Sequence, residues 1–376
     1  MDKKLDDKKI AIIYNTSWYV YNFRVNLIKH LQTFGAKIIV LAPRDNFTEK
    51  LIQLGCEFQE IYVKGNGMNP FQDLYTLYTI KKALKLVKPD ICLQYTIKPN
   101  IYGSIACLSK KIPVINNVAG LGSLFEKKNI MTIFALNLYK FAFKKASHIF
   151  FQNNDDLSLF KTHNIISNNY SRIPGSGVDL ERFKDFEEFQ EKKSFLLFSR
   201  LLKSKGVEEY LKAAEILKKD YPDYSFKLLG HFEKNNNQYI DESILNKFVS
   251  NGTIEYLGET DNVVPFIKDS GCIVLPSYYR EGVPRSLLES AAMSKAIITT
   301  DHIGCRDAVI DGFNGYLCEV ENYKDLADKM RKYIILSIEE KKSFGRNSRL
   351  FVEKYFDEKI VLDNYYSTIL KLLRIR

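Results

Sequence analysis

Residues Glu281 to Ser290 read EGVPRSLLES and place two carboxylates eight positions apart around the start of a predicted helix. Gly282 supplies a turn, and Pro284 followed by an apolar pair is typical of a first helical turn. Glu281 is therefore predicted on the loop before the helix, and Glu289 about two turns inside it on a similar face. N–H groups at such a helix start can bind a phosphate, and the two carboxylates can accept hydrogen bonds from a sugar and a ribose. The stretch predicts a nucleotide-sugar site.

The chain around this stretch alternates apolar, β-branched runs with amphipathic runs. In the second half the predicted strands are 194–199, 225–230, 253–257, 272–276 and 296–300, and the predicted helices are 207–219, 263–269 and 284–294. In the first half the predicted strands are 9–14, 37–42, 57–63, 91–95, 113–117 and 148–152, and the predicted helices are 22–34, 47–55, 71–87 and 100–109. This βαβ rhythm is typical of parallel sheets with helices on both faces.

The rhythm breaks in a charged stretch at 178–193, which is interpreted as a linker. The predicted fold class is therefore α/β, with two doubly wound, Rossmann-like domains facing each other across a cleft. The first domain spans 1–185, and the second spans 190–354. Ligands of such sheets bind beyond the carboxyl ends of the strands, so the loops at these ends are the expected sites.

Residues Phe198 to Gly206, FSRLLKSKG, follow the first strand of the second half. Arg200 and Lys205 flank a turn there, and two cations at a strand end can bind a diphosphate and stabilise its departure. Solvated loop cations would give the same pattern. Gly230 and Gly258 end later strands, where backbone groups could reach a nucleotide or simply form turns. Val263 lies at the start of a further helix that could face the base.

Several other site classes lack their motifs. The sequence contains no GxxxxGK[ST], no GxGxxG after the first strand, no GxSxG and no Asp-x-Asp pair. The six cysteines form no CxxC pair and the five histidines show no metal spacing, so no metal site is expected. The scattered cysteines are predicted to be reduced and buried, as in a cytosolic protein.

The formal net charge of +10 lies in the first half. Residues 1–180 carry 24 Lys and Arg against 13 Asp and Glu, which is +11, and residues 181–376 carry 31 against 32, which is −1. This asymmetry favours an anionic partner for the first half, although a solvated basic surface is the alternative. A nucleic-acid partner is not favoured, since no aromatic-basic binding motif is present.

No signal peptide and no apolar run of membrane-spanning length are found, so any membrane contact is expected to be peripheral. Residues 130–145, IMTIFALNLYKFAFKK, could form a helix that lies in a membrane interface. A buried crossover helix explains the same pattern.

Two loops of the first half are expected at strand ends. One carries Asn15 and Ser17, with Arg24 close behind, and the other carries Asn117, Gly120 and Gly122. Acceptor recognition is the functional interpretation of both loops. Ordinary turn chemistry is the alternative for the two glycines.

The two α/β halves, the pair Arg200 and Lys205, and the Glu-x7-Glu spacing together resemble the retaining glycosyltransferases of family 4, which have the GT-B fold. The resemblance covers essentially the whole chain. It implies that Arg200 and Lys205 bind the donor diphosphate, that Glu289 binds the ribose and that Glu281 meets the sugar hydroxyls. The backbone from Gly282 through Val283 and Pro284 to Arg285 would line the sugar and phosphate, with N–H groups from all of these residues except the proline.

The same resemblance implies a leaving diphosphate that takes the acceptor proton, with no metal and no cofactor, because the UDP-sugar is a substrate. Many members have a histidine in the loop that matches Asn117 to Gly120, and this chain has none there. In this fold the last segment, 355–376, crosses back to complete the first domain.

Further segments are similar to transferases of bacterial protein N-glycosylation: 21–24, 68–71, 120–123, 137–140, 275–278 and 304–305. This similarity implies transfer of N-acetylgalactosamine from UDP-GalNAc to undecaprenyl-diphosphate-linked N,N′-diacetylbacillosamine in α-1,3 linkage. The enzyme would then lie peripherally on the inner face of the cytoplasmic membrane. Two alternatives stay open: a capsule or O-antigen transferase that uses another UDP-sugar, and a nucleotide-sugar epimerase of GT-B fold.

Overall fold

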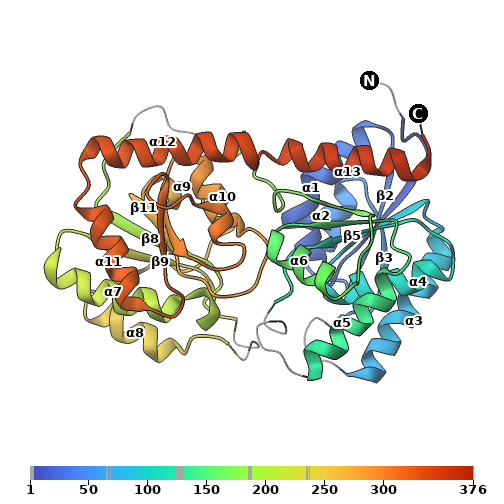
Figure 1. The fold of residues 1–376 in the computed structure, drawn as a ribbon, viewed down its shortest axis with the longest axis horizontal. Helices are drawn as coiled ribbons and strands as arrows, with labels where there is room; N and C mark the ends of the chain where they lie inside the picture. The colour runs from blue at the N-terminus through green and yellow to red at the C-terminus, as the bar shows by residue number, and fades with distance from the viewer. Residues whose placement is uncertain are drawn as a thin grey trace. The chain divides into compact units, whose positions relative to one another are not determined.

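The computed structural model describes residues 4–64, 67, 69–122, 125, 130–184, 189–233, 236 and 238–375. The chain divides into two compact units, each described by itself (Figure 1). Unit 1 comprises Met1–Ser176 and Lys359–Arg376, and unit 2 comprises Gly177–Glu358. Unit 2 thus begins earlier than the predicted boundary at 185–190. The reason is that Val178 and Phe183, which were assigned to the linker, are buried in the core of unit 2.

Unit 1 contains a seven-stranded parallel sheet with the strand order β3-β2-β1-β4-β5-β6-β7. Its strands are β1 (Lys9–Ile13), β2 (Lys37–Ala42), β3 (Glu57–Glu60), β4 (Ile91–Tyr95), β5 (Val114–Val118), β6 (His148–Phe151) and β7 (Tyr170–Arg172). In the register of β1, Ile12 is opposite Val40 on one side and Leu93 on the other. Central strands read as unbroken apolar runs because both faces of the sheet are covered.

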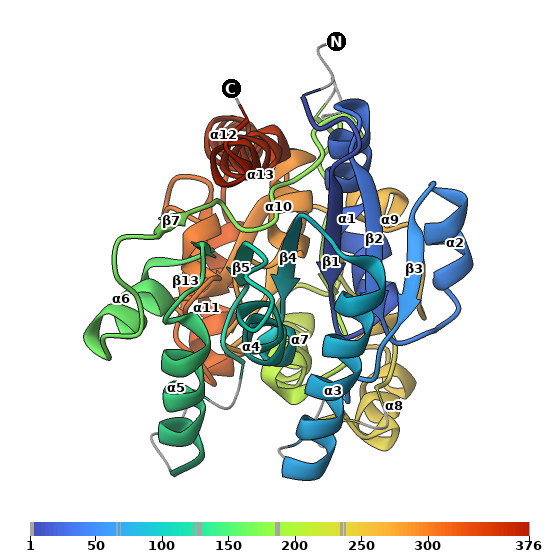
Figure 2. The same cartoon turned by 90° about the vertical axis from the view of Figure 1, so that its right-hand side faces the viewer.

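Helices cover both faces of this sheet (Figure 2). They are α1 (Ser17–Thr33), α2 (Thr48–Gln53), α3 (Pro70–Val87), the π-helix η1 (Pro99–Gly103), α4 (Ser104–Leu108), α5 (Ile130–Phe143), α6 (Asn154–Thr162) and α13 (Glu358–Leu373). Ile10 and Ile12 belong to the core under α1 and α13, whereas Ala11 and Ile13 belong to the core under α3 and α4. This alternation is the side-chain period of a strand.

Unit 2 contains a six-stranded parallel sheet with the order β10-β9-β8-β11-β12-β13. Its strands are β8 (Ser194–Phe198), β9 (Ser225–Leu229), β10 (Glu255–Tyr256), β11 (Cys272–Leu275), β12 (Ala296–Thr300) and β13 (Gly315–Cys318). Its helices are η3 (Lys203–Lys205), α7 (Val207–Asp220), α8 (Glu242–Ser250), α9 (Val264–Lys268), α10 (Arg285–Ala292), η4 (Arg306–Ala308), α11 (Tyr323–Ile334) and α12 (Ile338–Tyr355). The α7 and α11 side of the sheet encloses one core, and α10 and α12 enclose the other.

The predicted α/β class with two parallel, doubly wound sheets is confirmed. The six cysteines are all free and buried, as the sequence predicted. Over the part of the chain that the structure describes, no helix combines the length and the apolar character that a membrane span needs.

Candidate active site

The loops after β8 and β11 lie next to each other at the carboxyl edge of the unit 2 sheet. These two strands pair in parallel, with Phe195 opposite Cys272, so both end at the same edge. The loop after β8 carries Arg200 and Lys205, and the loop after β11 carries Glu281. The sheet therefore brings together three predicted site residues from segments that are far apart in the sequence.

Lys205 donates a hydrogen bond to Glu281 at this edge. The lysine side chain is only 9% exposed, and its charge is compensated by the carboxylate, as a nearly buried ion requires. Ser277 Oγ lies 3.4 Å from Glu281 Oε1, and Lys205 Nζ lies 5.5 Å from the ring centroid of Tyr279. The pair is thus held from several sides, with the partly exposed carboxylate as its more accessible member.

Arg200 forms an ion pair with Glu233, in which Nη1 lies 2.9 Å from Oε2. Glu233 follows β9, the neighbour of β8, and Asn236 Nδ2 donates to the same carboxylate oxygen at 3.3 Å. Sequence reasoning missed Glu233 because nothing local marks it. Its partner lies 33 positions away and meets it only through the strand order.

Helix α10 positions the second glutamate of the opening stretch. The helix begins at Arg285, and Pro284 is its N-cap with extended backbone, so the proline precedes the first turn that it was predicted to occupy. Arg285 Nη2 lies 2.9 Å from Glu289 Oε1, one turn later on the same helix. Burial raises the pKa of the Glu289 carboxyl, against the opposing charges of Arg285 and Arg182.

Close backbone contacts fix the loops around this edge. A Cβ at Gly206 would lie 2.1 Å from the carbonyl oxygen of Pro276, and one at Gly304 would lie 2.0 Å from that of Gly282. Both positions also have φ in the left-handed region, at +72° and +81°, so only glycine fits. The η3–α7 junction and the β12–η4 loop can therefore pack directly on the loop that carries Glu281.

The remaining predicted donor residues lie at the same edge of the sheet. Gly230 N donates to Gly258 O at 2.7 Å, which ties together the ends of β9 and β10. Val263 is the N-cap of α9 and packs on the core beside α10. Gly258 has a φ of +74° in open space, as a turn position allows, whereas a Cβ at Gly230 would lie 1.8 Å from Ser199 O, so close backbone packing accounts for that glycine. The reach of the two glycines toward a nucleotide stays a prediction.

In unit 1, the first predicted loop is largely occupied by internal contacts. Ser17 is fully buried and its hydroxyl donates to Pro43 O at 2.9 Å, whereas Asn15 is half-buried. Arg24 is buried, and its guanidinium lies 4.2 Å from the ring centroid of Tyr95. Burial alone lowers the pKa of Arg24, but the surrounding tyrosines, Tyr95 foremost, raise it overall.

The second predicted loop of unit 1 begins with Asn117, whose side chain forms hydrogen bonds inside the protein. Asn117 is fully buried; its Nδ2 donates to Tyr365 Oη at 2.7 Å and its Oδ1 accepts from Gln152 Nε2 at 3.1 Å. Gly120 and Gly122 both have positive φ, as turn positions require. Ser123 of the same motif lies outside the described residues, as does Met68 of another quoted segment.

Polar groups after β4, between these two loops, were not predicted. Thr96 has a left-handed φ of +66°, and among the described residues its hydroxyl and the side-chain oxygen of the buried Asn100 have no hydrogen-bond partner. Lys98 Nζ lies 2.8 Å from Asp73 Oδ1 of α3. The sequence signal that could have found these polar groups is their position directly after a predicted strand, because β4 ends at the same edge of the sheet as β1 and β5.

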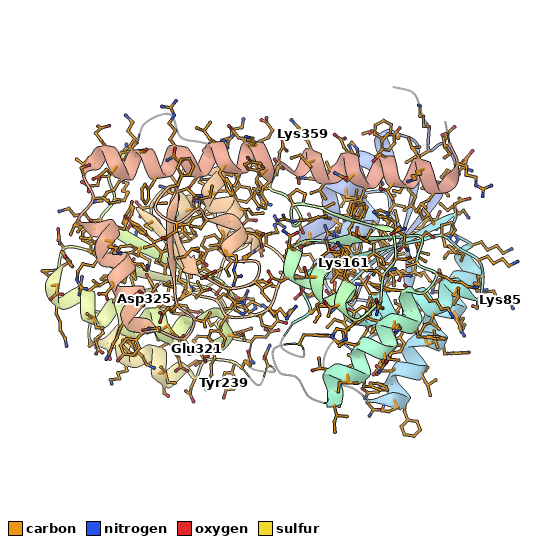
Figure 3. The ribbon with its side chains drawn as sticks, viewed as in Figure 1. Lys85, Lys161, Tyr239, Glu321, Asp325 and Lys359 are labelled. Atoms are coloured by element: carbon orange, nitrogen blue, oxygen red, sulfur yellow. The ribbon has the colours of Figure 1, made fainter. Side chains whose placement is uncertain are left out.

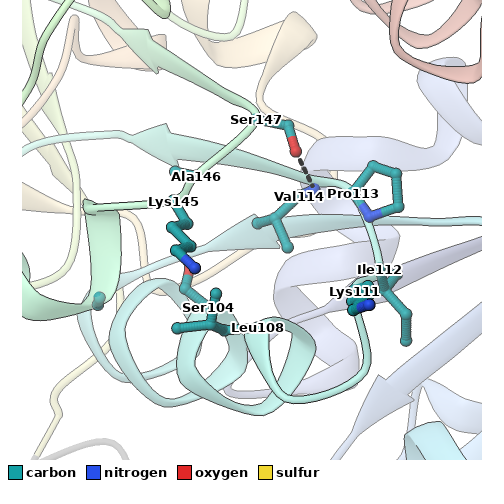
Figure 4. A pocket seen from close by; sticks show the side chains of 10 residues that line it. Ser104, Leu108, Lys111, Ile112, Pro113, Val114, Lys145, Ala146 and Ser147 are labelled. Carbon is teal, nitrogen blue, oxygen red and sulfur yellow. Dashed lines mark hydrogen bonds between the residues drawn. The ribbon is translucent and has the colours of Figure 1, made fainter.

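A cavity of about 340 Å³ lies at the opposite, amino-terminal edge of the unit 1 sheet (Figure 4). Val114 and Ser147, where β5 and β6 begin, line it, and Val114 N donates to Ser147 Oγ at 3.1 Å. This cavity is separate from the loops considered above. Within the described ranges, no three His, Cys, Asp or Glu side chains are grouped as metal ligands would be.

Comparison with known families and proteins gives a consistent result. Residues 9–153 match the family described as "Glycosyl transferase 4-like", and residues 179–351 match "Glycosyl transferases group 1". The chain is 29% identical over 387 aligned positions to the N,N′-diacetylbacillosaminyl-diphospho-undecaprenol alpha-1,3-N-acetylgalactosaminyltransferase of Campylobacter jejuni, covering 96% of this chain and 99% of that protein.

Two further proteins extend this comparison. The chain is 26% identical to an Escherichia coli UDP-Gal:alpha-D-GlcNAc-diphosphoundecaprenol alpha-1,3-galactosyltransferase, over 67% of this chain and 68% of that one. The fold of this chain is similar to that of HepE from Anabaena, whose structure was solved in complex with UDP and glucose. The TM-score is 0.80 at 17% identity, over 97% of this chain and 100% of that one. With matched families that together cover most of the sequence, the chain belongs to the GT-B glycosyltransferases and carries a 4-like domain followed by a group 1 domain.

Proposed function

We propose that this enzyme is a retaining, metal-independent glycosyltransferase that moves N-acetylgalactosamine from UDP-GalNAc to undecaprenyl-diphosphate-linked N,N′-diacetylbacillosamine. The new bond would be an α-1,3 linkage, in the assembly of a protein N-glycan. The observation that carries the proposal is the ion pair of Lys205 with Glu281 at the carboxyl edge of the unit 2 sheet, beside Arg200. The identity of the sugars rests on the relative from Campylobacter jejuni, whose name specifies these substrates.

In this proposal the cations at the edge bind the donor diphosphate. Lys205 and Arg200 are each held by a carboxylate, so they are positioned before the donor arrives. They stabilise the negative charge that develops on UDP as its bond to the sugar breaks. Glu281 accepts hydrogen bonds from sugar hydroxyls, and the N–H groups of the Gly282–Arg285 segment face the phosphate and sugar.

Glu289 accepts the ribose hydroxyls in the same proposal. Its ion pair with Arg285 opposes the rise that burial gives to the pKa of this nearly buried carboxyl. The leaving diphosphate takes the proton from the acceptor hydroxyl on the face where the new bond forms, so the anomeric configuration is retained. No side chain of unit 1 is assigned to proton transfer.

The acceptor is assigned to unit 1 and to the membrane. Residues 1–180 carry the net charge of +11 counted above, which favours an acceptor diphosphate and an anionic lipid surface. The enzyme would accordingly work on the inner face of the cytoplasmic membrane. The polar groups of Asn15, Thr96 and Asn100 at the carboxyl edge of unit 1 are candidates for contacts with the acceptor sugar.

A second candidate differs only in the donor. The relative from Escherichia coli is named for transfer of galactose from UDP-Gal to a diphosphoundecaprenol-linked sugar. A UDP-sugar other than UDP-GalNAc, in a capsule or O-antigen pathway, would use the same site.

The decisive experiment incubates the purified enzyme with a panel of UDP-sugars and a short-chain polyprenyl-diphosphate acceptor, with mass spectrometry of the products. UDP-GalNAc is expected to give a single added N-acetylhexosamine, and EDTA is expected to leave the rate unchanged. Conversion of the donor without any acceptor would identify an epimerase instead.

Matched variants test the site within this assay. Glu281→Ala and Arg200→Ala are expected to abolish transfer while circular dichroism still shows a folded protein. Glu339→Ala and Arg346→Ala, at exposed positions of α12, are the controls and are expected to keep full activity. Full activity of either site variant would refute the assignment.

A further inference from the structure

The outer faces of α3 and α5 carry large apolar side chains that unit 1 leaves uncovered. We use the name apolar tip for the exposed residues in the first turns of the two helices: Phe71, Leu74, Tyr75 and Tyr78 on α3, with Ile130, Met131, Ile133 and Phe134 on α5. Phe71 and Ile130 are each 83% exposed. Each set follows the spacing of one helical face, so the exposure is a continuous stripe and not scattered single residues.

Each stripe becomes basic farther along the same helix. On α3 the same face continues with Lys81, Lys82 and Lys85, and on α5 it continues with Lys140 and then Lys144 beyond the helix end. Lys81 follows Phe71 by ten residues, and Lys140 follows Ile130 by ten, which is about 15 Å along a helix in both cases. The two helices therefore carry their first lysines at the same distance from the apolar end.

The two helices are arranged so that these features coincide in space. Both α3 and α5 pack on η1 and α4 through their buried faces, and their N-terminal ends point in the same direction (Figures 1 and 2). Lys85, near the other end of α3, points outward (Figure 3). The apolar residues are thus gathered at one end of unit 1, with the lysines behind them.

Acidic side chains are missing from the exposed faces of the two helices. The sequence of α5 contains no Asp or Glu. The single acidic residue of α3, Asp73, is buried and paired with Lys98. The lysines lie beside the exposed Leu86 on α3 and Phe141 on α5, but no exposed carboxylate accompanies them. An apolar end backed by such a basic region matches the profile of an anionic bilayer, which has hydrocarbon inside and phosphate groups outside.

We infer that the apolar tip of α3 and α5 inserts into the interface of an anionic phospholipid bilayer, with Lys81, Lys85 and Lys140 at the phosphate level. The inference rests on the proposed function in one respect, because a polyprenyl-linked acceptor is held in a bilayer. It adds α3 to α5 as a second helix that enters the bilayer, and it specifies that the N-terminal end of each helix inserts. A second copy of the chain is disfavoured as the occupant, since a symmetric contact between these faces would offer the lysines no carboxylate partner.

Flotation of the full-length enzyme with phosphatidylcholine vesicles, with and without phosphatidylglycerol, tests the inference. The double variant Phe71→Ser/Phe134→Ser is expected to lower the bound fraction by about tenfold, because two large apolar side chains no longer leave water. Ile338→Ser/Leu350→Ser, at exposed apolar positions of α12, is the matched control and is expected to float like the wild type.

A second set of variants separates the contribution of the lysines to vesicle binding from that of the apolar tip. Lys81→Gln/Lys85→Gln/Lys140→Gln is expected to weaken the preference for phosphatidylglycerol and the salt dependence, whereas the exposed Lys342→Gln is expected to change neither. Wild-type flotation by the Phe71→Ser/Phe134→Ser variant would overturn the inference. So would a dimer, seen in sedimentation, that this variant dissociates without any change in flotation.

Transfer to a water-soluble, short-chain acceptor keeps this test apart from that of the proposed function. The tip variants are expected to retain this transfer, which also shows that they are folded. Vesicle binding that depends on the tip, in a protein that transfers no sugar, would uphold the inference and refute the proposed function.

Discussion

Lys205 and Glu281, which lie 76 positions apart in the sequence, form a hydrogen-bonded ion pair where β8 and β11 end side by side. The pair links the loop before α7 to the loop before α10. It also means that each residue has two tasks in the proposed enzyme, because each positions the other by an ion pair and also faces the donor.

Breaking this pair is expected to cost stability as well as activity. Lys205→Met removes the cation that donates a hydrogen bond to Glu281, and the free energy of unfolding is expected to fall by about 1–3 kcal/mol. The double variant Lys205→Met/Glu281→Gln should lose clearly less than the sum of the two single variants. Urea unfolding of the four proteins measures this coupling.

The control for that cycle is an exposed ion pair of the same unit. Asp328→Asn removes one of the two carboxylates that pair with Arg331 on α11, the other being Asp220, and is expected to change the free energy of unfolding by less than about 0.5 kcal/mol. Additive effects in the Lys205 and Glu281 cycle would show that the contact contributes nothing.

The raised pKa of Glu289 predicts a specific pH dependence of donor binding. The ribose contact requires the carboxylate, so affinity for UDP should fall on acidification at a pH above the ordinary carboxyl value of 4.5. Arg285→Ala removes a charge that lowers this pKa, so the fall should move to still higher pH. Titration calorimetry with UDP across the acidic range measures both shifts, and an identical profile in Glu289→Gln would contradict the assignment.

The same pKa predicts the sign of a stability change. Because the folded-state pKa is raised, the contribution of Glu289 to stability is fully present below the unfolded value and is lost as the pH rises through the folded value. Wild type should therefore lose stability relative to Glu289→Gln as the pH increases from about 4.5 toward neutrality. Melting temperatures of the two proteins over this window test the sign.

Gly304 offers a test of the close packing at the Glu281 loop. A Cβ there would lie 2.0 Å from Gly282 O at a φ of +81°, so Gly304→Ala is expected to cost more than about 3 kcal/mol and to abolish UDP binding. Gly312→Ala is the matched control, since it has a similar φ of +72° but no atom within 4 Å. It should cost about 1 kcal/mol. An equal loss of stability in Gly304→Ala and Gly312→Ala would show that the close contact of Gly304 with Gly282 O does not matter.

Tyr365 of α13 anchors the predicted acceptor loop from the C-terminal end of the chain. Its hydroxyl accepts a hydrogen bond from Asn117, so Tyr365→Phe leaves a buried amide N–H unsatisfied and is expected to cost about 1–3 kcal/mol. Tyr355→Phe, at an exposed position, is the control and should be neutral. A neutral Tyr365→Phe would show that Asn117 finds another partner.

Local periodicity was enough to predict most of the sheet. The strands 37–42, 91–95 and 296–300 match β2, β4 and β12 at both ends, because each is a buried apolar run bounded by turn residues. The predicted strand 253–257 shortens to Glu255–Tyr256, since β10 is an edge strand with a single neighbour. α8 was missed although Asp241 caps it, because its apolar positions span little more than one turn.

The site residues could be predicted where they share one local sequence motif, and could not be predicted where they meet only through the order of the strands in the sheet. Glu281 and Glu289 share one loop and helix, so their spacing was visible in the sequence. The pairing of Arg200 with Glu233 needs the order of β8 and β9, and the contact of Asn117 with Tyr365 spans 248 positions. The π-helix at Pro99–Gly103 replaces the start of a predicted α-helix, a change of hydrogen-bond register that composition does not reveal.

The placement of α13 has a consequence for the order in which the protein folds during synthesis. Tyr365 and Ile369 are fully buried in the core that α13 shares with β1, β2 and β4, so unit 1 is closed by residues that leave the ribosome only after all of unit 2. Unit 2 is one continuous segment and emerges whole before α13 does. Unit 2 is therefore expected to fold first, and the apolar sheet face of unit 1 is expected to stay exposed until α13 has been synthesised. A premature stop codon just after residue 358 would leave a folded unit 2 attached to an open and aggregation-prone unit 1.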